Sequence, residues 1–417
     1  MRMIARIAVR NILRHKRRTI TSGITIAVGM WFYTFMDSVM AGLDRGGIDN
    51  MIELTSSAVK IRTAEYDRDK EAFPLKHGIP DVEAVREELT QDPRVRGVAP
   101  RTRFVGQLSN YTEEVPVVGT VVEPAVDSTV FSLTEYLIGD YFSGDSRGEI
   151  ILGRQLAREM GVDTGGYITL YALTRYESRN ADEFRVVGLL NTSDPRLNRS
   201  SVMISCDAAG EFLDLDGLVT EVNVGLERRV NLADMKAEAR RVKERVEEAF
   251  PALTATTFME AAASFLELAK SKRAFGIVFL IVILVIAGVG IFNSVLMSVY
   301  ERIREVGVLR AHGIKPSEVS TMFVMEGFMT GVFGSVLGLI MGVATNVVLI
   351  TYGYPIDKIA GDIAMEGFPY WGTIYGEWNV GTLLFLLVFG ILTATIAGII
   401  PARKAGKMEV THALRFV

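Results

Sequence analysis

The chain has 417 residues, a net charge of -4 and a hydrophobic fraction of 49%. The length exceeds a typical single domain and the hydrophobic fraction is high for a soluble protein, so we expect several folding units that include membrane segments. The one cysteine, Cys206, excludes an intrachain disulfide, a cysteine-rich zinc site and a thiol relay.

Residues 1–18 are predicted to form an amphipathic helix in the cytoplasmic membrane interface. Five arginines recur at intervals of four, which places them on one side of a helix: Arg2, Arg6, Arg10, Arg14 and Arg18. The other side is apolar, and such a helix holds its arginines near anionic headgroups. The alternative is that these charges only set the topology, which explains their sign but not their spacing. No cleavable signal sequence is expected, because the first apolar run is too long for one.

Four runs are long and apolar enough to cross a bilayer, which takes about 20 residues. The spans are predicted at residues 19–43, 274–299, 321–352 and 380–400. Lysines and arginines gather before the first span, between the second and third, and after the fourth, whereas the loop between spans three and four has only Lys358. The positive-inside rule therefore makes both termini, including the tail 401–417, and residues 300–320 cytoplasmic. Asp37 in the first span is a candidate functional carboxylate, or alternatively an interfacial residue that reaches water.

Residues 44–256 are predicted to form a mixed α/β domain outside the membrane. β-rich runs alternate there with helical patterns at 81–90, 154–160 and 231–249. Proline and glycine punctuation near 124–127 and 144–148 indicates two subdomains. His77 is the only histidine in this region, which argues against a metal site or a histidine-based triad. We interpret the region as a binding or mechanical domain.

Residues 257–299 are predicted to form a stalk helix that continues into the second span. Apolar residues recur at helical spacing from Phe258 to Phe275. This pattern indicates that the stalk packs against a partner helix.

The cytoplasmic segment 300–320 carries charges of both signs, so it does more than anchor to lipid. Residues 300–319, YERIREVGVLRAHGIKPSEV, predict a short helix that ends at Gly313 and a following helix that opens at Pro316. Glu301, Glu305 and Arg310 are expected to be exposed on this short helix. A rigid knob between two membrane helices can pass a push from a soluble partner into the spans. A solvated loop without such a role is the alternative.

The third span has one helix face that is nearly bare of side chains. Its glycines are Gly331, Gly334, Gly338 and Gly342. Such a face lets another helix approach closely, and that helix belongs either to the same chain or to a second subunit. The outer loop 353–379 that follows is rich in tyrosine and tryptophan, which suit the outer headgroup layer.

The stretch GIFNSVLMSVYERIREVGVLRAHGIKPSEV, residues 290–319, resembles the signature of the FtsX-like permeases, the family that includes the MacB efflux pump and the lipoprotein-releasing LolC and LolE subunits. The pattern ER-x-R-E-[IV]-G-x-L-R-A-x-G is matched at Glu301, Arg302, Arg304, Glu305, Val306, Gly307, Leu309, Arg310, Ala311 and Gly313. Further family blocks are resembled by AVRNILRHKRRT, GEIILGRQLAREMGVDTGGYITL and IIPARKAGKMEVTHALR. The similarity therefore extends over essentially the whole chain.

This resemblance implies four transmembrane helices with a MacB-like α/β periplasmic core inserted between spans one and two. Two permeases, identical or homologous, would stand above a dimer of a separate cytoplasmic ABC ATPase that uses ATP and Mg²⁺. This chain would bind no cofactor and catalyse no reaction, and the phosphate-binding pattern G-x-x-x-x-G-K-[ST] does not occur in it. The ATPase would push on the coupling residues Glu301, Arg302, Arg304, Glu305, Gly307, Leu309, Arg310 and Gly313. The stalk helices would carry that motion outward, which is called mechanotransmission.

The function expected from the same resemblance is release of lipoproteins from the bacterial inner membrane to a periplasmic acceptor. The four spans, the lack of a fused ATPase and the size of the outer domain are similar to those of LolC and LolE. The alternatives are MacB-like export of drugs, peptides or toxins and FtsX-like signalling across the membrane. Membrane lipids are further expected partners, and nucleic acid is not.

Overall fold

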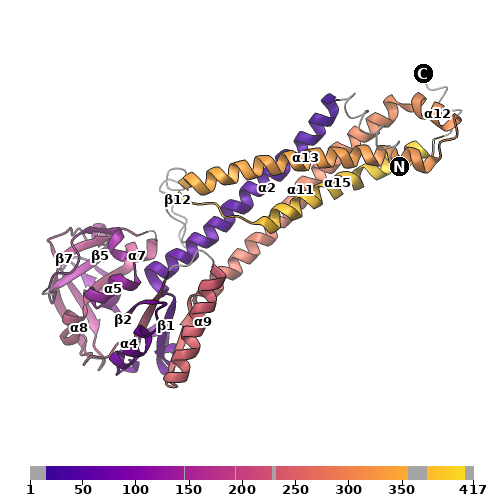
Figure 1. The fold of residues 1–417 in the computed structure, drawn as a ribbon. Coiled ribbons are helices and arrows are strands. Elements are labelled where there is room, and N and C mark those ends of the chain that lie inside the picture. The colour runs from indigo at the N-terminus through magenta and orange to yellow at the C-terminus, as the bar shows by residue number, and fades with distance from the viewer. Residues whose placement is uncertain (1–15, 145, 193, 228–231, 356–372, 409–417) are drawn as a thin grey trace. The chain divides into compact units, whose positions relative to one another are not determined.

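The computed structural model describes residues 16–144, 146–192, 194–227, 232–355 and 373–408. The described residues divide into two compact units (Figure 1). The helical unit comprises the described residues up to 44 together with 267–355 and 373–408, and the outer unit comprises those from 45 to 266.

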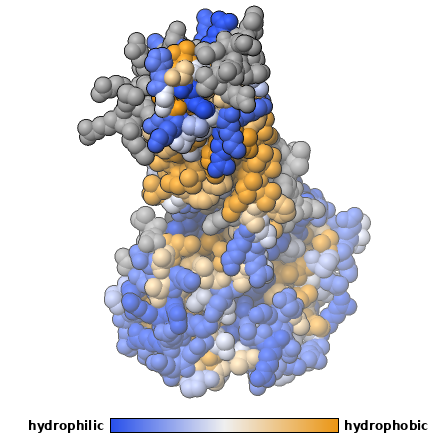
Figure 2. Space-filling model, turned by 90° about the vertical axis from the view of Figure 1, so that its right-hand side faces the viewer, coloured by the Kyte–Doolittle hydropathy of each residue, from blue (hydrophilic) through white to orange (hydrophobic). Residues whose placement is uncertain are grey.

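Long helices build the helical unit. They are α2 (Lys16–Met51), α11 (Ala263–Glu301), α13 (Pro316–Tyr352) and α15 (Val380–Gly406), with the short α12 (Ile303–Ala311) between α11 and α13 in the chain. Within the described residues, four helices are long and apolar enough to cross a membrane, judged by length and composition. Figure 2 shows apolar side chains along the flank of this unit. The expectation of four helices that could span a membrane is thus confirmed.

The core of the helical unit is drawn from all of its long helices. Ile26 and Met30 of α2, Leu284 of α11, Phe323 of α13 and Leu386 of α15 are buried in one cluster. α13 packs along α15 over much of its length. Each helix therefore has an inward face and an outward apolar face, as expected where lipid replaces water.

In the described part of the outer unit, ten strands form one sheet. The order is β10-β1-β9-β2-β3-β8-β5-β7-β4, and β6 pairs with both β2 and β7. The strands are β1 (Val59–Thr63), β2 (Val95–Ser109), β3 (Glu114–Val122), β4 (Leu137–Gly139), β5 (Glu149–Gly153), β6 (Tyr167–Leu173), β7 (Arg179–Leu190), β8 (Ser201–Ser205), β9 (Glu221–Leu226) and β10 (Leu253–Thr257). Because β6 bridges β2 and β7, strands β2, β3, β8, β5, β7 and β6 close into a ring.

Short helices and one long helix complete the outer unit. They are α3 (Ala64–Arg68), α4 (Val82–Thr90), α5 (Pro124–Val130), α6 (Arg154–Glu159), α7 (Pro195–Ser200), α8 (Cys206–Phe212), α9 (Leu232–Ala249) and α10 (Phe258–Ala261), and the π-helix η1 (Ile52–Ser56) follows α2. The helical patterns expected at 81–90, 154–160 and 231–249 correspond to α4, α6 and α9. An α/β unit therefore lies in the chain between the first two long helices, which confirms the expected fold class.

Two main apolar cores lie along the long strand β2. Phe104 and Leu108 belong to the core of the strand ring, together with Phe184. Val98 belongs to a second core, in which α4 and α9 cover strands β1, β9 and β10. Pro124 does not mark a boundary between these cores, because it opens α5, where its missing N–H costs nothing.

The segment expected to be one continuous stalk helix contains a break. Thr257 caps the short helix α10, since its hydroxyl accepts from the Glu260 amide at 3.4 Å and the Glu260 carboxylate accepts from the Thr257 amide at 2.8 Å. Ala262 then leaves α-helical geometry, and α11 begins at Ala263.

The outer loop after α13 returns through a short strand pair. β11 (Tyr354–Pro355) pairs antiparallel with β12 (Thr373–Ile374). Residues 356–372 of the predicted aromatic loop lie outside the described residues.

Candidate functional site

The predicted coupling segment is a short helix between two sharp breaks. α11 ends at Glu301, Arg302 adopts φ -115° and ψ 17°, and α12 runs from Ile303 to Ala311. Gly313 has φ +93°, a left-handed conformation that favours glycine and turns the chain. α13 then opens with Pro316 at its first turn, and the Glu318 carboxylate accepts from the Lys315 amide at 2.9 Å. The expected single helix from 300 is thus split at Arg302.

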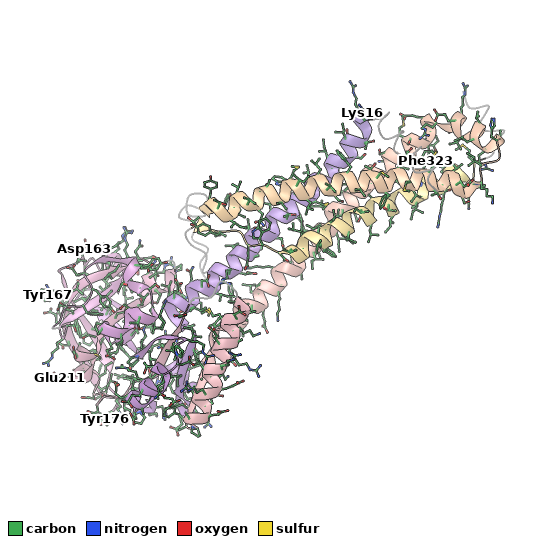
Figure 3. The ribbon with its side chains drawn as sticks, viewed as in Figure 1. Lys16, Asp163, Tyr167, Tyr176, Glu211 and Phe323 are labelled. Atoms are coloured by element: carbon green, nitrogen blue, oxygen red, sulfur yellow. The ribbon has the colours of Figure 1, made fainter. Side chains whose placement is uncertain are left out.

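α12 has an inward face and an outward face. Ile303, Val306 and Gly307 are buried, and Val306 packs in the same core as Phe323, the α13 residue labelled in Figure 3. Hydrophilic side chains gather at the end of the helical unit that carries α12 (Figure 2). Among the predicted coupling residues, the exposed ones are Glu301, Arg304, Glu305 and Gly313. These residues form the surface that a soluble partner can reach.

Arg302 does not belong to that surface. Its side chain is 7% exposed, and its Nη1 donates to the Glu326 carboxylate of α13 at 2.7 Å. Its Nε donates to Glu305 at 2.9 Å, and the Ser298 hydroxyl of α11 donates to the other Glu326 oxygen at 3.0 Å. The Arg302 guanidinium also lies 5.6 Å from the centre of the Phe323 ring. We call Ser298, Arg302, Glu305 and Glu326 the Arg302 clamp.

Arg310 also differs from the expectation of an exposed charge. It is half-buried, and its Nη1 donates to the backbone carbonyl of Gly406 at 2.6 Å and to that of Met408 at 3.4 Å. Carbonyls at a helix C-terminus lack intrahelical donors, so a cation there satisfies them and complements the helix dipole. Arg310 therefore ties α12 to the end of α15. Leu309 beside it is half-buried.

Sequence reasoning did not identify Glu326. It is 6% exposed and lies ten positions after the start of α13. A carboxylate inside an apolar span is a functional candidate by default, and the same signal drew attention to Asp37. Asp37 itself accepts from the Asn379 amide at 3.2 Å and is partly exposed, so it is neither buried nor isolated.

The glycines of α13 face two different helices of the same chain. A Cβ at Gly334, Gly338 or Gly342 would meet atoms of α2 at 2.8–2.9 Å, whereas one at Gly331 would meet Ala394 of α15 at 2.5 Å. Ser38 of α2 also donates a hydrogen bond to Asn346, and Trp31 donates to Thr345 at 2.8 Å. In this structure the bare face thus serves packing within one chain.

The outer unit buries several charges between its strands and α5. Glu221 forms ion pairs with Lys60 at 3.3 Å and Arg62 at 3.0 Å, and Arg101 binds Asp127 through two bonds of 2.7 and 2.8 Å. Burial lowers the pKa of Lys60 to about 8, against the attraction of Glu221. Burial opposes the ionised form of Glu221, but Lys60 and Arg62 lower its pKa to about 2.

These charges are structural pairs and give no metal centre. No group of three or more histidine, cysteine or acidic residues in the described part of the chain is arranged to hold a metal. His77 lies 3.0 Å from Glu65. Of the arginines predicted to lie in the membrane interface, Arg2, Arg6, Arg10 and Arg14 lie outside the described residues, and Arg18 is in the first turn of α2.

Two family models match the chain. Residues 19–242 match the MacB-like periplasmic core domain, and residues 277–410 match the FtsX-like permease C-terminal domain. The first of these covers most of the outer unit with the helix that leads into it and ends within α9, and the second covers α12, α13 and α15.

Curated relatives match to different extents. An uncharacterized ABC transporter permease of Methanocaldococcus jannaschii is 24% identical over 60% of this chain, which is 61% of that relative and so less than two thirds of it. The lipoprotein-releasing system transmembrane protein LolC of Xylella fastidiosa is 23% identical over 97% of both chains. The macrolide export ATP-binding/permease protein MacB of Bdellovibrio bacteriovorus is 30% identical over 32% of this chain and 18% of that relative.

Proposed function

The chain belongs to the family of ABC transporter permeases with a MacB-like periplasmic core and an FtsX-like C-terminal domain, and on this premise we propose that it releases lipoproteins from the inner membrane. The observation that supports this substrate is the extent of the match to LolC, which covers 97% of both chains. The match to MacB covers 18% of that protein. MacB-like export of drugs, peptides or toxins is the second candidate, supported by the periplasmic core, and FtsX-like signalling is the third.

In the proposed assembly, a separate cytoplasmic ATPase dimer docks on the exposed surface of α12, and a second permease stands beside this one. The ATPase uses ATP and Mg²⁺, while this chain binds no cofactor. Glu301 at the end of α11 and Arg304 in the first turn of α12 are exposed charges of opposite sign, which suits recognition by a charged groove. Both termini are cytoplasmic in this arrangement, and the outer unit is periplasmic or extracellular.

The substrate is tested by reconstitution. The chain, its ATPase and its permease partner are placed in liposomes with a fluorescent triacylated lipoprotein, and ATP is added with a soluble acceptor. Release of the label into the supernatant with ATP, but not with a non-hydrolysable analogue, is the expected result. Transport of a macrolide without lipoprotein release would favour export instead. The chain alone should neither bind nor hydrolyse ATP.

The docking surface is tested by reversing one exposed charge. A single exposed ion pair is worth only about 0.2–1 kcal/mol, so Glu301→Lys should leave insertion and expression nearly unchanged. Like charges that meet in an interface cost several kcal/mol, so the same variant should lose its ATPase on purification. Glu211→Lys is the matched control, because Glu211 is exposed on α8 of the outer unit (Figure 3). Equal ATPase retention by both variants would contradict the proposed surface.

A further inference from the structure

The Arg302 clamp lies at the break between α11 and α12, where the angle between these two helices is set. Arg302 is the residue at which helical geometry breaks between α11 and α12. Its bonds reach forward to Glu305 on α12 and across to Glu326 on α13, and Ser298 of α11 binds the same carboxylate. One network, buried except for Glu305, therefore joins the three helices that meet at the break.

Stability alone does not account for this network. Removing charges from water is costly, and well-packed apolar residues of similar volume often replace a buried ion pair without loss of stability. Hydrogen bonds to an arginine fork are directional, however, and apolar contacts are not. The clamp thus contributes orientation, which the apolar contacts of Ile303 and Val306 alone do not specify.

We propose that Arg302 and Glu326 are positioning residues that hold α12 in one orientation on α13, so that a push on the exposed face of α12 moves α13 with it. This inference rests on the proposed function, because it assigns the clamp a role in coupling to an ATPase. Neither residue touches the ATPase in this scheme. Arg310 anchors the other end of α12 to the carbonyls of Gly406 and Met408, so loss of the clamp frees mainly the end next to Arg302.

The first measurement separates stability from orientation. Arg302→Met leaves Glu326 buried without its cation and should lower the melting temperature of the purified permease by roughly 10 °C. The double variant Arg302→Met/Glu326→Met removes both charges and should melt within a few degrees of the parent. Ser38→Ala/Asn346→Leu is the matched control, since it removes another buried polar pair between α13 and a neighbouring helix.

The second measurement reports the orientation directly. Spin labels are attached to cysteines at Val308 on α12 and Val336 on α13, both exposed, in a Cys206→Ser background. The parent and the Ser38→Ala/Asn346→Leu control should give one narrow distance distribution. The double Met variant should give a broad one. An unchanged distribution in the double variant would refute the positioning role.

The third measurement asks whether orientation matters for coupling. In the full complex with its ATPase, the double Met variant should release at least fivefold less fluorescent lipoprotein per ATP hydrolysed than the control. Normal release per ATP despite a broad distribution would also overturn the proposal. If the parent complex shows neither ATPase retention nor release, the proposed function fails, and the distance distribution by itself still decides whether Arg302 and Glu326 orient α12.

Discussion

Replacing Gly338 by alanine tests the contact between α13 and α2. A Cβ at Gly338 would lie 2.9 Å from the Ala27 carbonyl oxygen, 2.9 Å from Met30 Cβ and 3.0 Å from Ala27 Cα. Two of these three atoms are backbone atoms of α2, which cannot rotate away. The helices must therefore separate along this seam, where Gly334 and Gly342 make similarly close approaches.

The steric cost of Gly338→Ala can be estimated and then compared with the effect of the same substitution at a second glycine. Carbon atoms prefer separations of about 3.5–4.0 Å, so α2 and α13 must move apart by roughly 0.5–1 Å. Overpacking of this kind costs about 1–3 kcal/mol. Glycine-to-alanine replacement in a helix also gains about 1 kcal/mol in helix propensity. Gly290→Ala in α11 carries the same gain in helix propensity without a clash, because, apart from its chain neighbours and the backbone of its own helix, no atom lies within 4 Å of a Cβ built there.

The difference between the two alanine variants isolates the steric cost. Both proteins are unfolded by sodium dodecyl sulfate in dodecylmaltoside micelles, and we expect Gly338→Ala to be less stable than Gly290→Ala by about 1–3 kcal/mol. Fluorescence of Trp31, which donates to Thr345 across this seam, reports the helix separation in a Trp371→Phe/Trp378→Phe background. Equal stabilities within about 0.5 kcal/mol would refute the packing argument. A change in oligomeric state without a change in stability would place the glycine face between subunits instead.

Four further outcomes concern the buried charges and the thiol of the outer unit. Asp127→Asn leaves the Arg101 charge buried without its partner and should lower the free energy of unfolding by about 3–5 kcal/mol. Arg101→Met/Asp127→Leu removes both charges and should be near neutral in thermal unfolding. Equal losses of stability in the two variants would show that the unpaired charge is not the cause. Burial lowers the pKa of Lys60 from 10.5 to about 8, so between these two pH values Lys60 is neutral in the folded state and still protonated in the unfolded state. The free energy of unfolding should therefore rise between pH 8 and pH 10.5, and Lys60→Met should flatten that rise. The pKa of Glu221 is lowered from 4.5 to about 2, so this carboxylate affects stability at acidic pH. Its contribution to the stability of the folded state is present above pH 4.5 and is lost as the pH falls toward 2. Cys206 is an exposed residue, but partial burial of its thiol and the nearby carboxylates of Asp207 and Glu123 raise the thiol pKa, so an impermeant maleimide applied outside the cell should label it faster at pH 9 than at pH 7. A cysteine at Lys404 should stay unlabelled, and labelling of Lys404→Cys alone would reverse the proposed orientation.

Local sequence patterns were sufficient to predict the long membrane helices. A membrane helix needs about 20 apolar residues, and runs of that length are readable without tertiary information. The end of α12 and the start of α13 were readable as well, because Gly313 and Pro316 act through their own backbone chemistry. The motif from Glu301 to Gly313 identified the family for a related reason, since the segment is continuous in the chain.

The contacts between distant segments were decided only by the tertiary structure. Glu305 is three positions from Arg302 and was recognisable as its partner, but Glu326 is 24 positions away on another helix and became its partner only when α13 folded back. The ring of strands closes because β6 pairs with both β2 and β7. The alternation of apolar and polar residues along β6 does not specify which strands it pairs with or in which register. Likewise, the spacing of the α13 glycines predicted a bare face, but whether α2, α15 or another subunit covers it depends on helix rotation and crossing, which long-range packing sets.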